Sequence, residues 1–266
     1  MSQVTYHQDL KELLKYVQIL PNHLNVLKEV ADCYANINKY YKAIPFYQKI
    51  EVLTPEDHEN ILLLANATYQ VGQFERSLEY FIKAEKKQPL SPEHLSYVGY
   101  CYQAVKDYSQ AVTYHLHAYK HMPHNLWNLG HIGYCFQALE DFEQAMKYYK
   151  VAEKLNPRED VILMNIGWIL LVKGQSQEAE KYLHKAYMLD NYDAYTLMNL
   201  GHVHLIKGEN SKAFDFYRRS IVEFSTQEEF KKLFEEDLRY LEIYNISQRT
   251  FGFIKDEMLA YAQTVR

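Results

Sequence analysis

The densest group of side chains that could bind a metal lies in residues 115–124, whose sequence is HLHAYKHMPH. His117 and His121 stand four residues apart, a spacing that places two imidazoles on one face of a helix, and His115 and His124 lie nearby. A zinc site usually needs three or four converging ligands, and no carboxylate or thiol joins these histidines. We therefore expect no metal here and interpret the run as a solvated, histidine-rich outer surface.

The three cysteines are the other residues with metal or redox potential. Cys33, Cys101 and Cys135 are separated by multiples of 34 residues. Residues at the same interval elsewhere are small or aliphatic, namely Ala67, Ile169 and Val203. A position that accepts cysteine, alanine, isoleucine and valine is typical of apolar packing, so we expect no redox or metal role. An odd number of cysteines in a long chain also favours a reducing compartment.

Motifs of enzyme chemistry are missing from the sequence. It contains no nucleophile elbow, no glycine loop that would cradle a phosphate and no HExxH pair, and we attribute its glycines to helix packing. We therefore expect a non-catalytic protein without a cofactor.

Charge and hydropathy limit the remaining classes of partner. A formal net charge of -5 gives no long-range attraction to polyphosphate, which argues against nucleic acid. No stretch approaches the roughly 20 apolar residues that cross a bilayer, and the N-terminal sequence lacks the apolar segment of a signal peptide. We expect a cytoplasmic protein without a membrane partner.

A 34-residue period organises the whole chain. It relates five prolines, Pro21, Pro55, Pro89, Pro123 and Pro157, and four glycines, Gly99, Gly133, Gly167 and Gly201. A fixed period of this length is the signature of a solenoid, in which each helical pair buries its apolar face against its neighbours.

The period divides the chain into capping segments and repeats. Residues 1–23 form half a repeat, an amphipathic N-terminal capping helix. Six full repeats follow, 24–57, 58–91, 92–125, 126–159, 160–193 and 194–227. Residues 228–266 predict two C-terminal capping helices, the first with an apolar face at Phe230, Phe234 and Leu241. An alternative is that this amphipathic pair docks onto another protein.

The clearest repeat, 126–159, has small residues at positions eight, twenty and twenty-seven, aromatic residues at eleven and twenty-four, and proline at thirty-two. These are Gly133, Ala145, Ala152, Phe136, Tyr149 and Pro157. The pattern resembles the tetratricopeptide-repeat family over residues 24–227. The resemblance implies an all-α fold, a right-handed superhelical solenoid of helix-turn-helix repeats with capping helices at both ends.

The resemblance also implies a binding surface, because in this family the first helices of the repeats line a concave groove. Both tryptophans and many tyrosines and amides fall at the positions that would face it. The candidate peptide-binding residues are Asn66, Tyr97, Tyr100, Gln103, Trp127, His131, Tyr134, Gln137, Asn165, Trp168, Tyr195, Asn199 and His202. Such residues are enriched at binding hot spots, although rings on an inner surface can also simply pack on one another.

A carboxylate clamp, which some members of this family use to hold a chain terminus, is not matched. Lys28 fits its first position, but Asp32, Leu63, Glu93 and Tyr97 do not fit the others. We expect a protein-interaction scaffold that binds an extended or helical segment of another protein without such a clamp. An alternative is the recognition arm, or a chaperone-like subunit, of a larger enzyme or secretion assembly. Self-association remains possible.

Overall fold

The computed structural model describes residues 3–265 of the chain, with side chains described from residue 10 to residue 264. Residues 1, 2 and 266, which belong to the two predicted capping segments, lie outside the described residues. Every regular element between residues 3 and 265 is a helix, so the predicted all-α fold is confirmed. The chain divides into two compact units, an N-terminal unit of Met1–Glu140 and a C-terminal unit of Asp141–Arg266.

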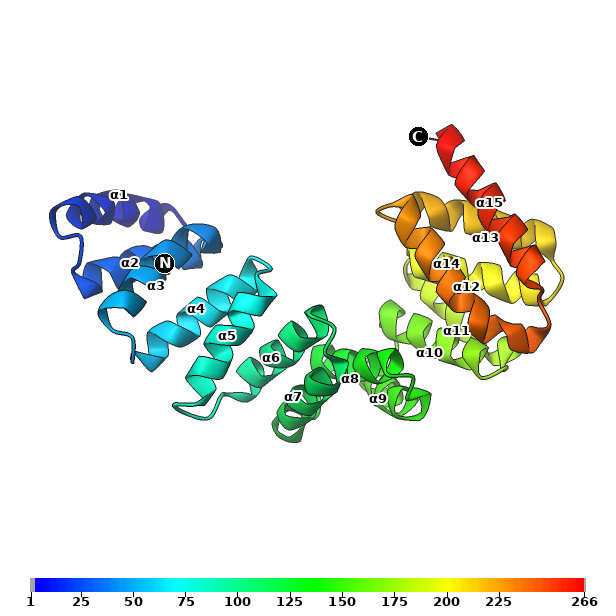
Figure 1. Ribbon diagram of the computed structural model, residues 1–266, viewed down its shortest axis with the longest axis horizontal. Helices are drawn as coiled ribbons and strands as arrows, with labels where there is room; N and C mark the ends of the chain where they lie inside the picture. The colour runs from blue at the N-terminus through cyan, green and yellow to red at the C-terminus, as the bar shows by residue number, and fades with distance from the viewer. Residues whose placement is uncertain (1–2, 266) are drawn as a thin grey trace. The chain divides into compact units, whose positions relative to one another are not determined.

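The N-terminal unit is a succession of helices that pack as hairpins (Figure 1). Small side chains allow the two helices of a hairpin to approach closely, since Ala65 of the second repeat and Ser77 opposite it are both fully buried. The helices are α1 (Gln3–Ile19), α2 (Leu24–Asn36), α3 (Tyr40–Leu53), α4 (His58–Gln70), α5 (Phe74–Glu85), α6 (Pro92–Ala104), α7 (Tyr108–His121) and α8 (Leu126–Ala138).

The C-terminal unit has seven α-helices among its described residues and one short 3-10 helix (Figure 1). Its core gathers aromatic rings from α13, α14 and α15 around Tyr217, Phe230, Phe234 and Phe251. The elements are α9 (Phe142–Leu155), α10 (Asp160–Val172), α11 (Ser176–Leu189), α12 (Ala194–Ile206), α13 (Asn210–Glu223), α14 (Gln227–Leu241), η1 (Glu242–Tyr244) and α15 (Gln248–Val265).

The turn inside each repeat has the same backbone geometry at its fifteenth position. The residues there all adopt a left-handed conformation, with φ between 56° and 77°, and are Asn38, Gly72, Lys106, Glu140, Gly174 and Gly208. Glycine adopts this conformation without steric cost. Our attribution of all glycines to helix packing is therefore wrong for Gly72, Gly174 and Gly208, which a tight turn requires.

Glycines inside the first helices have the predicted packing role. A methyl group added at Gly99 would lie 2.8 Å from the His115 ring, and one at Gly167 would lie 2.7 Å from Cγ of Leu183. Glycine in a helix costs about 1 kcal/mol relative to alanine. The close approach of the second helix in these hairpins offsets that cost.

The start of α6 has the order Ser91, Pro92, Glu93, which is typical of an N-cap, a first helical residue and an acidic first turn. The Ser91 hydroxyl accepts a hydrogen bond from the backbone N–H of His94 at 3.3 Å, and Pro92 occupies the first turn. Proline fits there because the first N–H groups of a helix have no partner within it. Glu93 is the acidic residue of this first turn.

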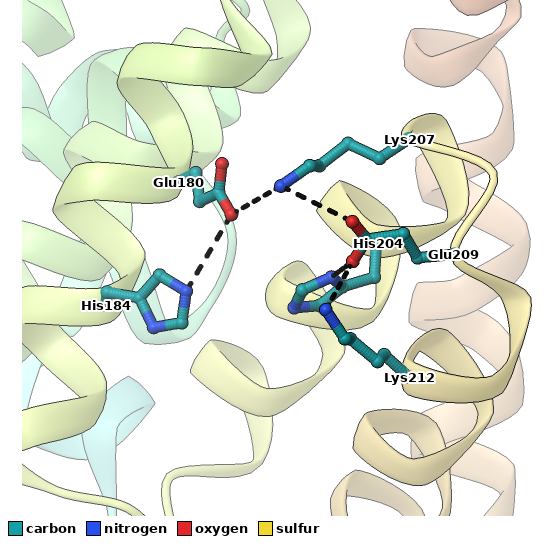
Figure 2. A network of polar contacts seen from close by, with 6 residues as sticks. All are labelled: Glu180, His184, His204, Lys207, Glu209 and Lys212. Carbon is teal, nitrogen blue, oxygen red and sulfur yellow. Dashed lines mark hydrogen bonds and ion pairs between the residues drawn. The ribbon is translucent and has the colours of Figure 1, made fainter.

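Polar side chains join α11 to the turn between α12 and α13, as Figure 2 shows. Lys207 lies 2.9 Å from Glu180, and Glu209 accepts hydrogen bonds from Lys212 at 3.0 Å and from His204 at 2.8 Å. The hydrogen bonds from Lys212 and His204 lower the pKa of Glu209 to about 2. Ion pairs between exposed side chains are weak because water screens them, so the network orients the turn more than it stabilises the unit.

The cysteines are packing residues. Cys101 and Cys135 are fully buried and Cys33 nearly so, all as free thiols. Burial raises the pKa of the Cys101 thiol to about 11 and that of Cys135 to about 12, which keeps both protonated and unreactive at neutral pH.

No helix within the described residues is both long enough and apolar enough to span a membrane.

Candidate functional site

Five aromatic side chains from three helices of the N-terminal unit touch one another and form what we call the aromatic patch. They are Tyr69 of α4, Tyr97 and Tyr100 of α6, and Trp127 and His131 of α8. Ring centroids are 4.7 Å apart for Tyr69 and Tyr97, 5.8 Å for Tyr100 and Trp127, and 4.2 Å for Trp127 and His131. The repeat brings rings from successive first helices onto a single surface.

The aromatic patch is only partly covered. The Trp127 side chain is 40% exposed, and the other four rings are half-buried. A pocket of about 290 Å³ opens among Tyr69, Tyr97 and Trp127, and Glu93, Ser96, Met122 and Asn125 complete its lining. The rings therefore pack on one another and still leave an open space, so the two alternatives of self-packing and binding are compatible. Phe74 and His94, which also contact these rings, were not among the predicted site residues.

A buried histidine packs against the aromatic patch. His115 is fully buried, stacks on His131 with ring centroids 5.6 Å apart, and donates from Nδ1 to Oδ1 of Asn128 at 2.7 Å. Asn128 in turn donates to the backbone carbonyl of His115 at 2.9 Å. The interpretation of residues 115–124 as a solvated surface is therefore wrong for His115, because its ring replaces the core aromatic residue of its repeat. His117 and His121 do lie together, with ring centroids 6.0 Å apart.

Burial of these imidazoles disfavours their charged forms. It lowers the pKa of His115 to about 4, against the opposing effect of the hydrogen bond with Asn128. Burial, with repulsion from His115 as a smaller cause, also lowers the pKa of His131. His131 is therefore neutral at pH 7. Its Nδ1–H donates to Oε1 of Gln103 at 2.8 Å.

Lowering the pH from 7 to 5 should destabilise the N-terminal unit. His115 takes up a proton near pH 6.5 in the unfolded chain, which is within this range of pH. In the folded chain it does so only near pH 4, which is below the range. The unfolded state thus binds more protons, and stability falls as the pH falls, by about 1–2 kcal/mol from His115 alone. Each unit contains one tryptophan, so urea unfolding of a Trp168→Phe variant, followed through Trp127, measures this unit.

His115→Leu provides the control for this pH dependence. Leu183 holds the equivalent position against Gly167, so leucine is compatible with the packing of such a hairpin. The variant should lose much less stability between pH 7 and pH 5 than the wild type, with His131 as the remaining contributor. An equal loss in both proteins would show that His115 is not the titrating group.

The amides and the last tyrosine of the predicted site in this unit are arranged around the aromatic patch. Asn66 contacts Nε2 of His94 through its Nδ2 at 3.2 Å, and Gln103 accepts from His131. Tyr134 is 41% exposed and its ring lies 6.1 Å from that of Tyr108, while Gln137 is half-buried. Asn66 and Gln103 are thus engaged with histidines of the patch region, and neither is a free amide.

In the C-terminal unit, helix α14 covers the surface where the remaining predicted residues lie. Asn165, Asn199 and His202 are at most 8% exposed. Trp168 is half-buried, and its Nε1 donates to Oδ1 of Asp237 on α14 at 3.2 Å. Our expectation that these four residues face an open groove is wrong, because Asn165, Asn199 and His202 are buried and because Trp168 and His202 contact Asp237 of α14.

Tyr195 lies at the edge of this covered surface. It is 39% exposed, and its hydroxyl donates to Oε1 of Glu229 on α14 at 2.9 Å. The crevice that remains between Trp168, His202 and Tyr240 is too small for a water molecule. This crevice therefore offers no space to a partner while α14 is in place.

A buried chain of hydrogen bonds attaches α14. The Tyr217 hydroxyl donates to Nδ1 of His202 at 2.9 Å, and Nε2 of His202 lies 3.2 Å from Oδ2 of Asp237. All three residues are at most 8% exposed. The carboxylate of Asp237 thereby accepts from both His202 and Trp168, which satisfies the requirement that a buried charge be hydrogen-bonded. An Asp–His–Tyr series enclosed in a core is a packing device.

Metal-ligating side chains do not gather anywhere in the described part of the chain. Between residues 10 and 264, no group of three or more histidine, cysteine, aspartate or glutamate side chains is arranged to hold an ion.

Comparison with known proteins agrees with the 34-residue period. Family models of the tetratricopeptide repeat match residues 62–121, 128–159 and 161–193. A search of curated proteins finds no match.

Several solved structures have the same fold. YrrB, described as a TPR protein with an unusual peptide-binding site, has a TM-score of 0.60 at 15% identity, over 70% of this chain and 95% of that chain. MamA 41-end from Desulfovibrio magneticus RS-1 has a TM-score of 0.59 at 16% identity, over 63% and 95%. A further crystal structure of MamA has a TM-score of 0.56 at 19% identity, over 61% and 95%. Given this fold, the matching family models and the periodic residues, the chain is a member of the tetratricopeptide-repeat family.

Proposed function

We propose that this chain is a non-catalytic protein-interaction scaffold and that the aromatic patch of its N-terminal unit binds a peptide segment of a partner protein. The observation that supports this role is the open aromatic patch itself, five touching rings of which three line a pocket of about 290 Å³. Tyrosine and tryptophan provide a large contact area at a low cost in side-chain entropy, which is why they dominate binding hot spots. The peptide-binding site of the similar protein YrrB is consistent with such a use of the fold.

This proposal is narrower than a groove along five repeats. Asn165, Asn199 and His202 are buried, and Trp168 and His202 contact α14, so we assign these four residues a structural role in the C-terminal unit. Tyr97, Tyr100, Trp127 and His131 are the residues that we propose to contact the partner, with Tyr69 as an addition. Gln103 is a positioning residue, because it holds His131. Tyr134 and Gln137, further along α8, would extend the contact.

Trp127→Ala should weaken peptide binding at least tenfold. Trp127 is the most exposed of the five rings, and truncating an aromatic hot-spot residue typically costs about 2 kcal/mol or more. Short random peptides displayed on phage can be selected against the wild type, and the affinities of the enriched peptides can then be compared between the two proteins.

Tyr41→Ala is the matched control. Tyr41 is an aromatic residue of the same unit, 62% exposed, but it lies on α3 and outside the aromatic patch. It should bind the selected peptides as the wild type does, and both variants should keep the helical content of the parent. Selected peptides that bind Trp127→Ala with wild-type affinity would refute the proposed site.

A further inference from the structure

The pocket in the aromatic patch combines ring faces with a single type of charge. Three of the residues around it are aromatic, Tyr69, Tyr97 and Trp127, and the one ionisable carboxylate in its lining is Glu93. The rings of Tyr97 and Trp127 meet at 74°, with centroids 6.3 Å apart, so they form two walls of a corner rather than a flat surface. No lysine or arginine contributes to this lining.

Glu93 is held as a carboxylate. Hydrogen bonds from its own backbone N–H and from the Ser91 hydroxyl lower its pKa. Its side chain is exposed, at the first turn of α6. It therefore presents a negative charge at the rim of the pocket at any physiological pH.

The first helices of the repeats in the N-terminal unit carry an excess of negative charge. Among the first helices of the N-terminal unit, α2, α4, α6 and α8, the acidic residues are Glu29, Asp32, Glu59 and Glu93. Lys28 is the one lysine or arginine on these four helices, and it is paired with Glu59 at 2.8 Å. A second pocket, of about 400 Å³ between α1 and α2, is also bordered by carboxylates, those of Glu12, Glu29 and Asp32. These carboxylates favour a cationic group over an anionic one at both pockets.

The dipoles of α6 and α8 oppose a cation in the pocket, but more weakly than the aromatic rings and Glu93 attract it. The pocket lies near the starts of α6 and α8, whose positive ends would disfavour a cation by about 0.3–1 kcal/mol. Both ends are already capped, by the side chains of Ser91 and Asn125. A cation over an aromatic face gains about 0.5–1 kcal/mol at an exposed site and up to about 2 when desolvated, and Glu93 adds to this gain. An anion would instead meet the carboxylate and the negative faces of the rings.

We propose that this pocket receives an arginine side chain of the bound segment, with the guanidinium stacked on Trp127 or Tyr97 and paired with Glu93. Arginine suits it better than lysine, because a planar guanidinium can stack on a ring and donate to a carboxylate at the same time. The assignment rests on the proposed function, since it names the anchor of a peptide bound at the aromatic patch.

The test uses four pools of immobilised peptides with the same random flanks and a central Arg, Lys, Gln or Glu, at physiological ionic strength. The wild type should bind the Arg pool about tenfold more tightly than the Gln pool, with the Lys pool between them and the Glu pool weakest. Glu93→Gln should reduce the Arg preference, taken as the ratio of Arg-pool to Gln-pool affinity within that variant, to about threefold. Glu79→Gln, an equal change of charge at an exposed site on α5 outside the pocket, should keep the full preference.

The outcomes separate this inference from the proposed function. If all four pools bind the wild type equally and Trp127→Ala abolishes that binding, the peptide site stands and the arginine pocket is refuted. The same conclusion follows if Glu93→Gln keeps the tenfold preference, or if Glu79→Gln loses as much of it as Glu93→Gln. If no pool binds the wild type, or if Trp127→Ala binds as the wild type does, the proposed function fails and the inference fails with it.

Discussion

Replacing Phe234 with alanine should lower the free energy of unfolding of the C-terminal unit by about 3–5 kcal/mol. Its ring is 1% exposed and lies in the centre of the core. Ring centroids are 4.9 Å away at Phe251 of α15 and 5.2 Å away at Tyr217 of α13. Truncation leaves a cavity where three helices meet, and the aromatic rings around it are too rigid to fill the space.

Urea unfolding measured in a Trp127→Phe background isolates this effect, because Trp168 is then the one tryptophan and lies in the C-terminal unit. Its indole donates to Asp237 on α14, so its emission also reports whether α14 stays docked. Phe253→Ala is the matched control, since this ring on α15 is 58% exposed and its loss should change the stability by about 0.5 kcal/mol or less. A loss below about 1.5 kcal/mol for Phe234→Ala would contradict a core role for α14.

Helix α14 closes the surface around Trp168 and His202. Phe230, Phe234 and Leu241 of α14 are each at most 2% exposed, so the helix is part of the core. Loss of the Phe234 ring weakens the docking of α14 and thereby exposes the ring of Trp168, whose indole donates to Asp237 of that helix. We therefore expect red-shifted Trp168 emission in this variant before the unit unfolds globally.

The fold could be predicted from the sequence because the 34-residue spacing of small residues reflects how the helices pack. Each small residue at the eighth position meets a residue of the second helix, as Gly99 meets His115 and Gly167 meets Leu183, so the spacing of these residues specifies a helical hairpin. The aromatic patch of the N-terminal unit was predictable in the same way, since Tyr97, Tyr100 and Trp127 occupy positions that the hairpin does not need.

The packing of α14 against Trp168 and His202 could not be predicted from the repeat, because α14 lies outside the 34-residue period. One signal was nevertheless present. Phe230, Phe234, Asp237 and Leu241 share a helical face, so Asp237 is an acidic residue within an apolar stripe. A carboxylate in that position needs buried donors, which Trp168 and His202 supply. Periodicity within a repeat says which residues face outward, but it does not say whether a later helix covers them.

Gly201→Ala should destabilise the C-terminal unit by about 1–3 kcal/mol even though alanine favours helix. An added methyl carbon would lie 2.5 Å from Cδ1 of Tyr217 and closer still to Cε1. Tyr217 has no room to move, because it is fully buried, donates to His202 and packs on Phe234. The gain in helix propensity, about 1 kcal/mol, is smaller than the cost of displacing this ring.

Gly252→Ala tests the same substitution where space is available. Gly252 lies within α15, and a methyl carbon there would meet no atom within 4 Å. Alanine should therefore stabilise the unit by up to about 1 kcal/mol, opposite in sign to Gly201→Ala. Both values can be measured by urea unfolding in the Trp127→Phe background. Equal effects at the two sites would mean that backbone propensity, and not the contact with Tyr217, selects glycine at the eighth position, whereas opposite signs would establish the contact as the cause.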